Sequence, residues 1–478
     1  MTIAQNNRII SQQRPALSDD ALLDLVQRQT FLYFWEGAHP ASGLARDHIS
    51  LLEEPQDDCV AIGGSGFGVM AIIAATERGW LTRDEALTRL ALMLNLLERA
   101  PCYHGHFPHF MNGRTGACCA PRPGVSCYSC GGPGGATIPF SRKDDGGDIV
   151  ETALLFQGLL CARQYFDRDT SAEKSLRDRI TCLWLDVEWN WHVREGHSVL
   201  TWHWSPNNGF SLAHEIRGWN ECLLTYVLAA ASPRSPIDSS VYHDGWAQSR
   251  SFLNGHSYYD IELPLGPPYG GPLFFCHYSF CGLDPRGLED VYANYWRQNT
   301  HHVRINIEHC IRNPGNHKGY GPSCWGLTAS DDPGGYYVHA PGDDKCARAC
   351  ASGHVSVQCC KRHAPDEDNG VIAPTAALSS FPYAPEAALR AMRHFYDKLG
   401  DRLWGRFGFT DAFSEDADWF SHTYLAIDQG PIVAMIENHR TGLLWNLFMK
   451  DPDVQVGLRR LGFQSPHLKQ DPAGSRKS

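Results

Sequence analysis

Apolar residues recur at helical spacing along most of the chain, beginning with residues 18–36. Ser18 is placed to cap this first segment, whose apolar residues return every three or four positions. The segment 82–85 (TRDE) has the form of a capping box and predicts a helix that runs to Glu98. The same spacing predicts further helices at about residues 63–76, 149–166, 171–188, 217–231, 240–253, 286–299, 303–312, 386–399, 422–449 and 452–461.

Alternating strand patterns are few and short, for example residues 199–204, and strand–helix–strand alternation is absent from the sequence. Long loops rich in glycine, proline and tryptophan connect the helices at residues 263–272 and 313–341. Loops of that length in a compact domain usually carry function. The pattern therefore predicts an all-α chain of helical hairpins with long loops and few short strands.

The glycine-rich segment 63–68 opens one of these helices and invites comparison with a nucleotide-binding loop. However, no lysine of the Walker type follows it, and no strand–helix–strand unit surrounds it. Close helix packing, or a sugar that approaches the backbone, accounts for these glycines instead.

The 478 residues carry a net charge of −11, and the 42 basic residues are scattered rather than clustered. This distribution gives no electrostatic footprint for nucleic acid and favours a neutral substrate. The 14 tryptophans are enough for a core and for stacking on sugar rings. No stretch has the ~20 apolar residues of a membrane span, and no signal peptide is recognisable. We expect no membrane partner and a cytoplasmic location, or a periplasmic one if this is a mature form; the oligomeric state is not predicted.

Four carboxylates gather in residues 141–151, immediately before an apolar helix pattern. Asp148 and Glu151 have the spacing of an acidic capping box, so capping of that helix is one interpretation. Capping does not account for Asp144 and Asp145. Spacings of four and three residues place Asp144, Asp148 and Glu151 near one face, and clustered carboxylates raise one another's pKa values, as acid–base chemistry requires.

Two more acids stand out against apolar helix patterns. Glu221 follows Trp219 at a helix start, where it is either an ordinary first-turn acid or a carboxyl whose pKa the tryptophan raises by desolvation. Asp428 interrupts an apolar helix, so it either hydrogen-bonds a neighbouring group or performs chemistry. Hydrolysis of a glycosidic bond needs two such carboxyls, one that protonates the leaving oxygen and one that activates water.

The segment 137–152 (TIPFSRKDDGGDIVET) resembles the glycoamylase-like family, specifically the bacterial endo-β-1,2-glucanases of glycoside hydrolase family 144. The likeness continues through residues 218–224, 319–330, 368–376, 424–432 and 435–442, so that it spans about residues 20–463. It implies an (α/α)6 barrel formed by residues 18–463 as a single catalytic domain. An N-terminal extension, residues 1–17, precedes this domain, and the tail, residues 464–478, lacks an apolar pattern and is predicted to be disordered.

The resemblance also implies roles for matching positions. Glu221 is expected to be the general acid and Asp428 the base, with inversion at the anomeric carbon. Asp144, Asp148 and Glu151 match positions that the family needs for activity. Contact with sugar is expected from Trp219, Asn220, Arg142, Lys143, Gln429, Tyr320 and Trp325, with core packing as the alternative for Tyr320 and Trp325.

Two segments, residues 117–136 and 344–367, depart from the family pattern beside expected active-site loops. They contain eight clustered cysteines: Cys118, Cys119, Cys127, Cys130, Cys346, Cys350, Cys359 and Cys360. Cys127 and Cys130 have half the spacing of a zinc site; disulfides and unpaired inserts are the other interpretations. No second C-x-x-C is present, so we predict no metal site and no cofactor.

The sequence thus predicts a glycoside hydrolase that cleaves β-1,2-glucan by endo action. Exo action on β-1,2-glucooligosaccharides and transglycosylation are alternatives within the same family. The alternative from another class is a non-catalytic glucan-binding protein.

Overall fold

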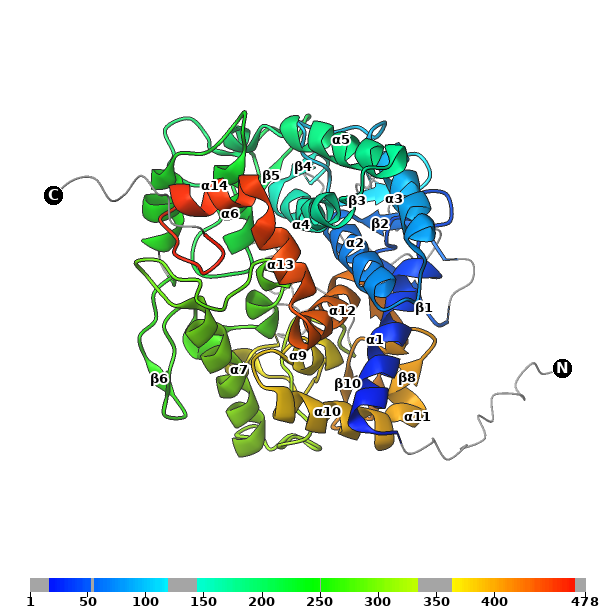
Figure 1. Cartoon of the computed structure of the whole chain (residues 1–478). Helices are drawn as coiled ribbons and strands as arrows, with labels where there is room; N and C mark the ends of the chain where they lie inside the picture. Colours follow the sequence, from blue (N-terminus) through cyan, green and yellow to red (C-terminus); the bar gives the residue numbers. More distant parts are fainter. Residues whose placement is uncertain (1–16, 53–55, 119–143, 250, 334–362, 469–478) are drawn as a thin grey trace.

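The computed structural model describes residues 17–52, 56–118, 144–249, 251–333 and 363–468, which form a predominantly helical molecule (Figure 1). The predicted helical class with few short strands is confirmed at this level. The α-helices of the described residues are α1 (Asp19–Trp35), α2 (Ile62–Glu77), α3 (Arg83–Leu97), α4 (Ile149–Tyr165), α5 (Ser171–Leu185), α6 (Leu223–Ala231), α7 (Tyr295–Arg312), α9 (Pro374–Leu378), α10 (Pro385–Asp397), α11 (Gly400–Leu403), α12 (Ala426–Arg440), α13 (Leu443–Lys450) and α14 (Pro452–Arg460).

Short strands pair two by two in antiparallel ladders. These pairs are β1 (His48–Ser50) with β12 (Thr423–Leu425), β2 (Cys59–Ala61) with β3 (Phe110–Asn112), β4 (Gly147–Asp148) with β5 (His203–Trp204), β6 (Ser257–Tyr258) with β7 (Ile261–Glu262), β8 (Trp404–Gly405) with β9 (Gly408–Phe409), and β10 (Phe413–Ser414) with β11 (Trp419–Phe420). Each pair is only two or three residues long per strand, so the ladders fasten loops to one another and do not form a sheet layer.

Helices α2 and α4 pack closely at the centre of the molecule. A side chain at Gly63 would meet Glu151, and one at Gly66 would overlap the backbone of Leu154. The contacts therefore advance in the same direction along both helices, which run parallel. Gly158 of α4 faces Gly66 in turn, so glycines on both helices allow the close approach. Close helix packing is thus the explanation of the glycine-rich segment that the structure supports.

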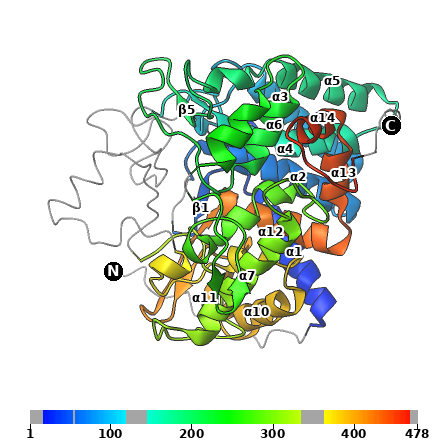
Figure 2. The same cartoon turned by 90° about the vertical axis from the view of Figure 1, so that its left-hand side faces the viewer.

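Helix α12 lies on another side of α2 and also runs parallel to it. A side chain at Gly64 would meet Ala426, and one at Gly430 would meet Phe67. The N-termini of α2, α4 and α12 therefore lie at the same end of the molecule. Each of these helices starts directly after a short strand, namely β2, β4 and β12. Figure 2 shows β1 and β5 on one side of the molecule and α13 and α14 on the other.

Several predicted helices differ from the observed ones. The pattern at 217–231 becomes a helix only at Leu223, so Glu221 precedes α6. The pattern at 240–253 forms a short π-helix, η2 (Val241–Ala247). The apolar spacing predicts two helices, at residues 286–299 and 303–312, but one continuous helix, α7, begins at Tyr295. The pattern at 422–449 divides at Gly442, whose positive φ of 70° ends one helix before the next begins.

The predicted disorder of residues 464–478 is wrong for the part that the structure describes. The backbone N–H of Gln464 donates to the carbonyl of Glu289 at 2.7 Å. The His467 ring lies 2.8 Å from the Asp284 carboxylate, and Leu468 packs against the core. Residues 469–478, the N-terminal residues 1–16 and most of the two cysteine-rich segments lie outside the described residues.

Candidate active site

Asp148 is the N-cap of α4, as its position in the sequence predicted. Its Oδ1 accepts the backbone N–H groups of Val150 and Glu151, each at 2.9 Å. The reciprocal half of the capping box is absent, because Glu151 points to a different helix. Its Oε2 accepts the backbone N–H of Gly63 in α2 at 2.7 Å. Glu151 therefore ties the N-terminus of α2 to that of α4.

Two histidines surround Asp148, and the sequence reasoning missed both. The Asp148 Oδ2 lies 3.2 Å from His109 Nδ1 and 3.4 Å from His203 Nε2. The Asp144 Oδ2 lies 4.0 Å from His109 and 3.9 Å from His203. His109 also reaches Glu151, with 3.5 Å between Nε2 and Oε1. The three predicted acids therefore do converge, and His109 lies among them.

Burial and neighbouring charges set a different protonation state for each of these groups. Burial alone would lower the pKa of His109, but the charges of Glu151, Asp148 and Asp144 raise it to about 10. Burial alone would raise the pKa of Asp148, but the hydrogen bond from His109 and the nearby His203 lower it to about 2. Burial raises the pKa of Glu151 to about 7, against the opposing charge of His109. At neutral pH Asp148 is therefore ionised, His109 is charged, and Glu151 is poised to exchange a proton.

Replacing His109 with Gln tests this charge arrangement. Because the folded-state pKa of about 10 lies above the ordinary value of 6.5, the stabilisation is complete below pH 6.5 and is lost as pH rises towards 10. We expect the variant to be destabilised by roughly 3–5 kcal/mol at pH 6.5 or below, with a gap that narrows at alkaline pH. Thermal unfolding across this range measures the gap. His197→Gln, at a half-exposed site beside Glu215, is the control, and a gap that widens with pH would contradict the arrangement.

Glu221 lies in the loop that leads into α6, and its side chain is half-buried. The next residue, Cys222, is a fully buried thiol whose pKa reflects the charges around it. Burial raises the pKa of Cys222, and the charges of Glu221, Asp148 and Glu151 raise it further. The charges of all three carboxylates thus reach the thiol that immediately precedes α6.

Asp428 lies in the first turn of α12 and is 1% exposed. Its Oδ1 accepts the Tyr278 hydroxyl at 3.5 Å, and its backbone carbonyl accepts the Thr375 hydroxyl at 2.7 Å. A side-chain hydrogen bond joins it to Asp411, a buried acid between β9 and β10. Burial, with the charge of Asp331, raises the pKa of Asp428 to about 7. Sequence reasoning missed Asp411, which follows the strand GF in a polar-looking loop.

Tyr278 and Ser279 connect the two predicted catalytic acids. The Tyr278 hydroxyl donates to the Asp428 carboxylate, and the hydroxyl of the next residue, Ser279, donates to the backbone carbonyl of Glu221. Two consecutive residues thus contact the Asp428 carboxylate and the backbone of Glu221.

Three of the residues predicted to contact sugar are buried instead. Trp325 is fully buried, and its indole N–H points to the Ala387 carbonyl of α10 at 3.4 Å. Trp219 is 3% exposed and packs on Trp246 at 5.9 Å between ring centroids. Gln429 is also buried and donates to the Phe409 carbonyl at 3.1 Å. A ring or amide with no free surface cannot stack on or bind a sugar, so these three residues belong to the core.

The other residues predicted to contact sugar differ in their surroundings. The Asn220 Oδ1 accepts the backbone N–H of Cys222 at 3.0 Å, which shapes the turn that presents Glu221. The Tyr320 hydroxyl donates to Asp368 at 2.9 Å, in a separate cluster with His317. Arg142 and Lys143 lie outside the described residues. Core packing is therefore the better interpretation for Trp325, whereas Tyr320 is half-buried and bound to another acid.

Two groups of metal-binding residue types occur among the described residues. They are His109 with Asp148 and His203, and Cys324 with His394 and Glu415; in each, the donor atoms lie within 4.8 Å of one another. In the first group, His109 already supplies a positive charge beside Asp148. Cys127 and Cys130, the pair considered for zinc, lie outside the described residues. None of the described helices is long and apolar enough to cross a membrane.

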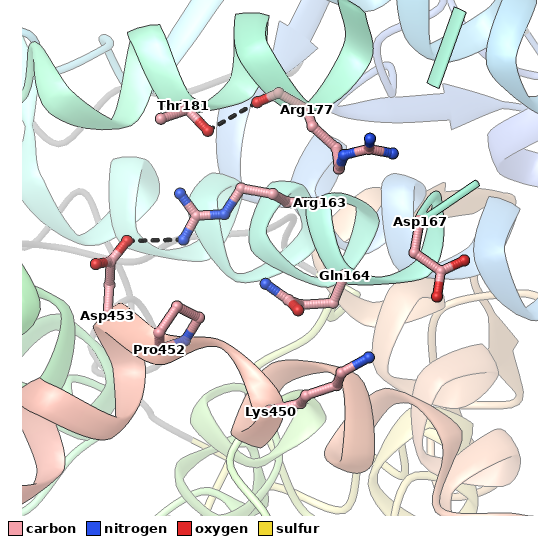
Figure 3. A pocket seen from close by; sticks show the side chains of 8 residues that line it. All are labelled: Arg163, Gln164, Asp167, Arg177, Thr181, Lys450, Pro452 and Asp453. Carbon is pink, nitrogen blue, oxygen red and sulfur yellow. Dashed lines mark hydrogen bonds and ion pairs between the residues drawn. The ribbon is translucent and has the colours of Figure 1, made fainter. Parts of the chain in front are cut away.

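A polar cavity of about 440 Å³ lies elsewhere, between α4, α5 and the start of α14 (Figure 3). Its wall includes Arg163, Arg177 and Lys450, and Arg163 pairs with Asp453 at 2.8 Å. Arg163 is at the C-terminal end of α4, whereas Asp148 caps its N-terminus. The cavity is therefore at the opposite end of α4 from the carboxyl cluster, and we do not assign it to the candidate active site.

The chain matches the family model named Glycoamylase over residues 213–452. It is similar to the endo-β-1,2-glucanase from Chitinophaga pinensis, whose structure holds sophorotriose and glucose. The two are 47% identical with a TM-score of 0.83, over 95% of this chain and 100% of that one. It is 40% identical to the exo β-1,2-glucooligosaccharide sophorohydrolase of Parabacteroides distasonis over 96% of this chain. The chain spans 60% of the length of that relative.

A more distant structural neighbour is the endo-β-1,2-glucanase from Talaromyces funiculosus, which is 11% identical with a TM-score of 0.58. At this identity the likeness concerns the fold alone. The matches to the family model and to the Chitinophaga pinensis enzyme extend through the segments that contain Glu221, Asp411 and Asp428. The chain therefore belongs to the glycoamylase-like family that includes these bacterial β-1,2-glucan-degrading relatives.

Proposed function

We propose that the chain is a glycoside hydrolase that cleaves β-1,2-glucan, with Glu221 as general acid and Asp428 as general base. The observation that carries this proposal is the link through Tyr278 and Ser279, which brings the two carboxyl-bearing segments together. Glycoside hydrolysis requires two carboxyls across the scissile bond. Glu221 and Asp428 are some two hundred residues apart in the sequence, and two neighbouring residues, Tyr278 and Ser279, contact both of them.

The two acids suit different tasks. Asp428 has a pKa of about 7, so it is partly ionised near neutrality and can take a proton from water. Glu221 is half-buried and can reach a leaving oxygen from the loop before α6. Direct inversion then follows: Glu221 protonates the leaving oxygen while water, deprotonated by Asp428, attacks from the opposite face of the sugar.

Asp148 and Glu151 serve the substrate in this proposal. Asp148 stays ionised, and its position is fixed by the N-terminus of α4 and by His109. Asp144 lies within 4.0 Å of the same histidine. Carboxylates held in this way are strong acceptors for the hydroxyl groups of a neutral sugar. The group therefore positions one glucose unit beside Glu221. The charges of Glu221, Asp148 and Glu151 all raise the pKa of the same buried thiol, Cys222.

For the fold we propose an (α/α)6 barrel formed by residues 18–463. Support comes from the parallel inner helices α2, α4 and α12, whose N-termini meet at the end that carries the acids. Helix α1 packs against α12 in the opposite direction, because Gln27 reaches Glu437 whereas Tyr33 lies beside Tyr424. Alternation of inner and outer helices in opposite directions is the arrangement expected of stacked helical hairpins.

Endo action is the mode we propose, because the whole chain of the endo-acting Chitinophaga pinensis relative is covered at 47% identity. The exo-acting relative is covered over only 60% of its length. Exo action, from the likeness to that relative, is the second candidate. Transglycosylation remains the third mode within the same chemistry.

Incubating the protein with linear β-1,2-glucan tests the proposal. We expect oligosaccharides of mixed length early in the reaction, because an endo-acting enzyme cuts at internal bonds. Polarimetry or NMR should show the α-anomer first, as inversion at a β-linkage requires. Early release of a single short product would indicate exo action, and binding without any new reducing ends would favour a glucan-binding protein.

A further inference from the structure

We propose that Asp411 is a positioning residue for Asp428: the two buried carboxyls hold one proton between them, and this hydrogen bond orients Asp428. This inference rests on the proposed role of Asp428 as base.

The contact is enclosed. Asp411 is 2% exposed and Asp428 is 1% exposed, and a side-chain hydrogen bond joins them. Each carboxyl has one oxygen, Oδ1 in Asp411 and Oδ2 in Asp428, that accepts no N–H or O–H donor from the described residues. Two carboxylate oxygens can form a hydrogen bond only if one of them carries a proton. The pair is therefore a shared-proton pair and not two anions.

The other oxygens show which partner each carboxyl has. The Asp411 Oδ2 accepts the backbone N–H of Asp331 at 2.6 Å. The Asp428 Oδ1 accepts the Tyr278 hydroxyl at the longer distance of 3.5 Å. The backbone bond holds Asp411 firmly in place, whereas Asp428 keeps an oxygen only loosely engaged.

The placement of the proton follows from the surrounding charges. Burial and the charges of Asp428 and Asp331 raise the pKa of Asp411 well above its ordinary range. For Asp428, burial raises the pKa to about 7 while the hydrogen bond from Asp411 lowers it. At neutral pH the pair therefore holds one proton, and the contact with Asp411 orients Asp428.

Other titratable groups lie near the pair on some of the neighbouring elements. The first turns of α2 and α9 contain none. The groups that do act on Asp411, on Asp428 or on their neighbour Asp331 are Asp331 itself, Tyr278, Tyr33 of α1 and His48 of β1, with Asp47 beside His48. Burial alone would lower the pKa of His48, but Asp47, Asp57 and Asp331 raise it to about 9. His48 is therefore charged at neutral pH and offsets Asp331, which leaves Asp411 as the direct partner of Asp428.

The experiment compares Asp411→Asn with Asp411→Leu. Asn keeps a donor to Asp428, whereas Leu has a similar shape but no donor. We expect the acidic limb of kcat/KM to stay near the wild-type position in the Asn variant and to move to higher pH in the Leu variant. At pH values below 7 the Leu variant should lose roughly 10–100-fold in rate, and the Asn variant less than about 10-fold. If the acidic limb of kcat/KM lies at the same pH in both variants, Asp411 only fills space and the proposal is wrong.

A second measurement does not depend on hydrolysis. One pH unit above the pKa of about 7 of Asp428, the pair should still hold one proton. Infrared difference spectra of wild type against Asp411→Asn should then show the loss of one carboxylic-acid carbonyl band. Asp284→Asn is the matched control, because Asp284 is equally buried but is paired with Arg286 and His467. If the band is lost while glucan is not cleaved, the proton pair stands and the proposed function fails; an unchanged band overturns the pair.

Discussion

Replacing Glu221 with Gln is expected to lower the rate of β-1,2-glucan hydrolysis at least ~100-fold, because the amide cannot give a proton to the leaving oxygen. KM should change little, since the side chain keeps its shape. Rates at substrate concentrations above and below KM separate these effects. An aryl glycoside with a dinitrophenolate leaving group should lose much less, because that leaving group departs without protonation.

The control for this variant is Glu215→Gln. Glu215 lies six residues earlier, in ion pairs with Arg194 and Arg217. It has no contact with Asp428 or with the acids at the start of α4 among the interactions described. We expect near-normal hydrolysis from the control. Near-normal hydrolysis from Glu221→Gln itself would remove Glu221 from the mechanism.

Asp428→Asn is expected to reduce hydrolysis by roughly 10²–10⁴-fold, because water then lacks a base. Added azide needs no deprotonation and should restore part of the turnover, giving a glycosyl azide with the α-configuration. Asp416→Asn, at an exposed acid that binds His317, is the control. Azide rescue that gives the β-glycosyl azide, with retained configuration, would contradict the assignment, because it would indicate the acid/base residue of a retaining enzyme.

Much of the helical framework could be predicted from the sequence. The caps at Ser18 and Thr82 formed as expected, since local hydrogen bonds decide them. The start of α6 could not be predicted, because the apolar residues before Leu223 belong to a turn whose path is set by Asn220 and by Ser279, a residue distant in sequence. Periodicity reports burial, and a buried turn resembles a buried helix.

The acids were identified from motifs, but their partners were not. His109 and His203 reach Asp148 through the pairing of distant segments, for which a single sequence carries no signal. Asp411 stands in a short loop between two strands of two residues each, where an acid looks like an ordinary turn residue. The sequence left core packing open for Trp325, and the inward packing of Trp219 has a similar origin, because an aromatic residue beside a catalytic motif packs inward as readily as outward.

The contact between Gly66 and Gly158 has a consequence for how this chain can change over time. One extra methyl group at either position would force α2 and α4 apart, and the bond between the Gly63 amide and Glu151 spans the same seam three residues away. The spacing of α2 and α4, and with it the position of Glu151, is thus fixed by two missing side chains deep in the interior. Variants with a new substrate preference should therefore arise from the loops, while these two glycines stay constant.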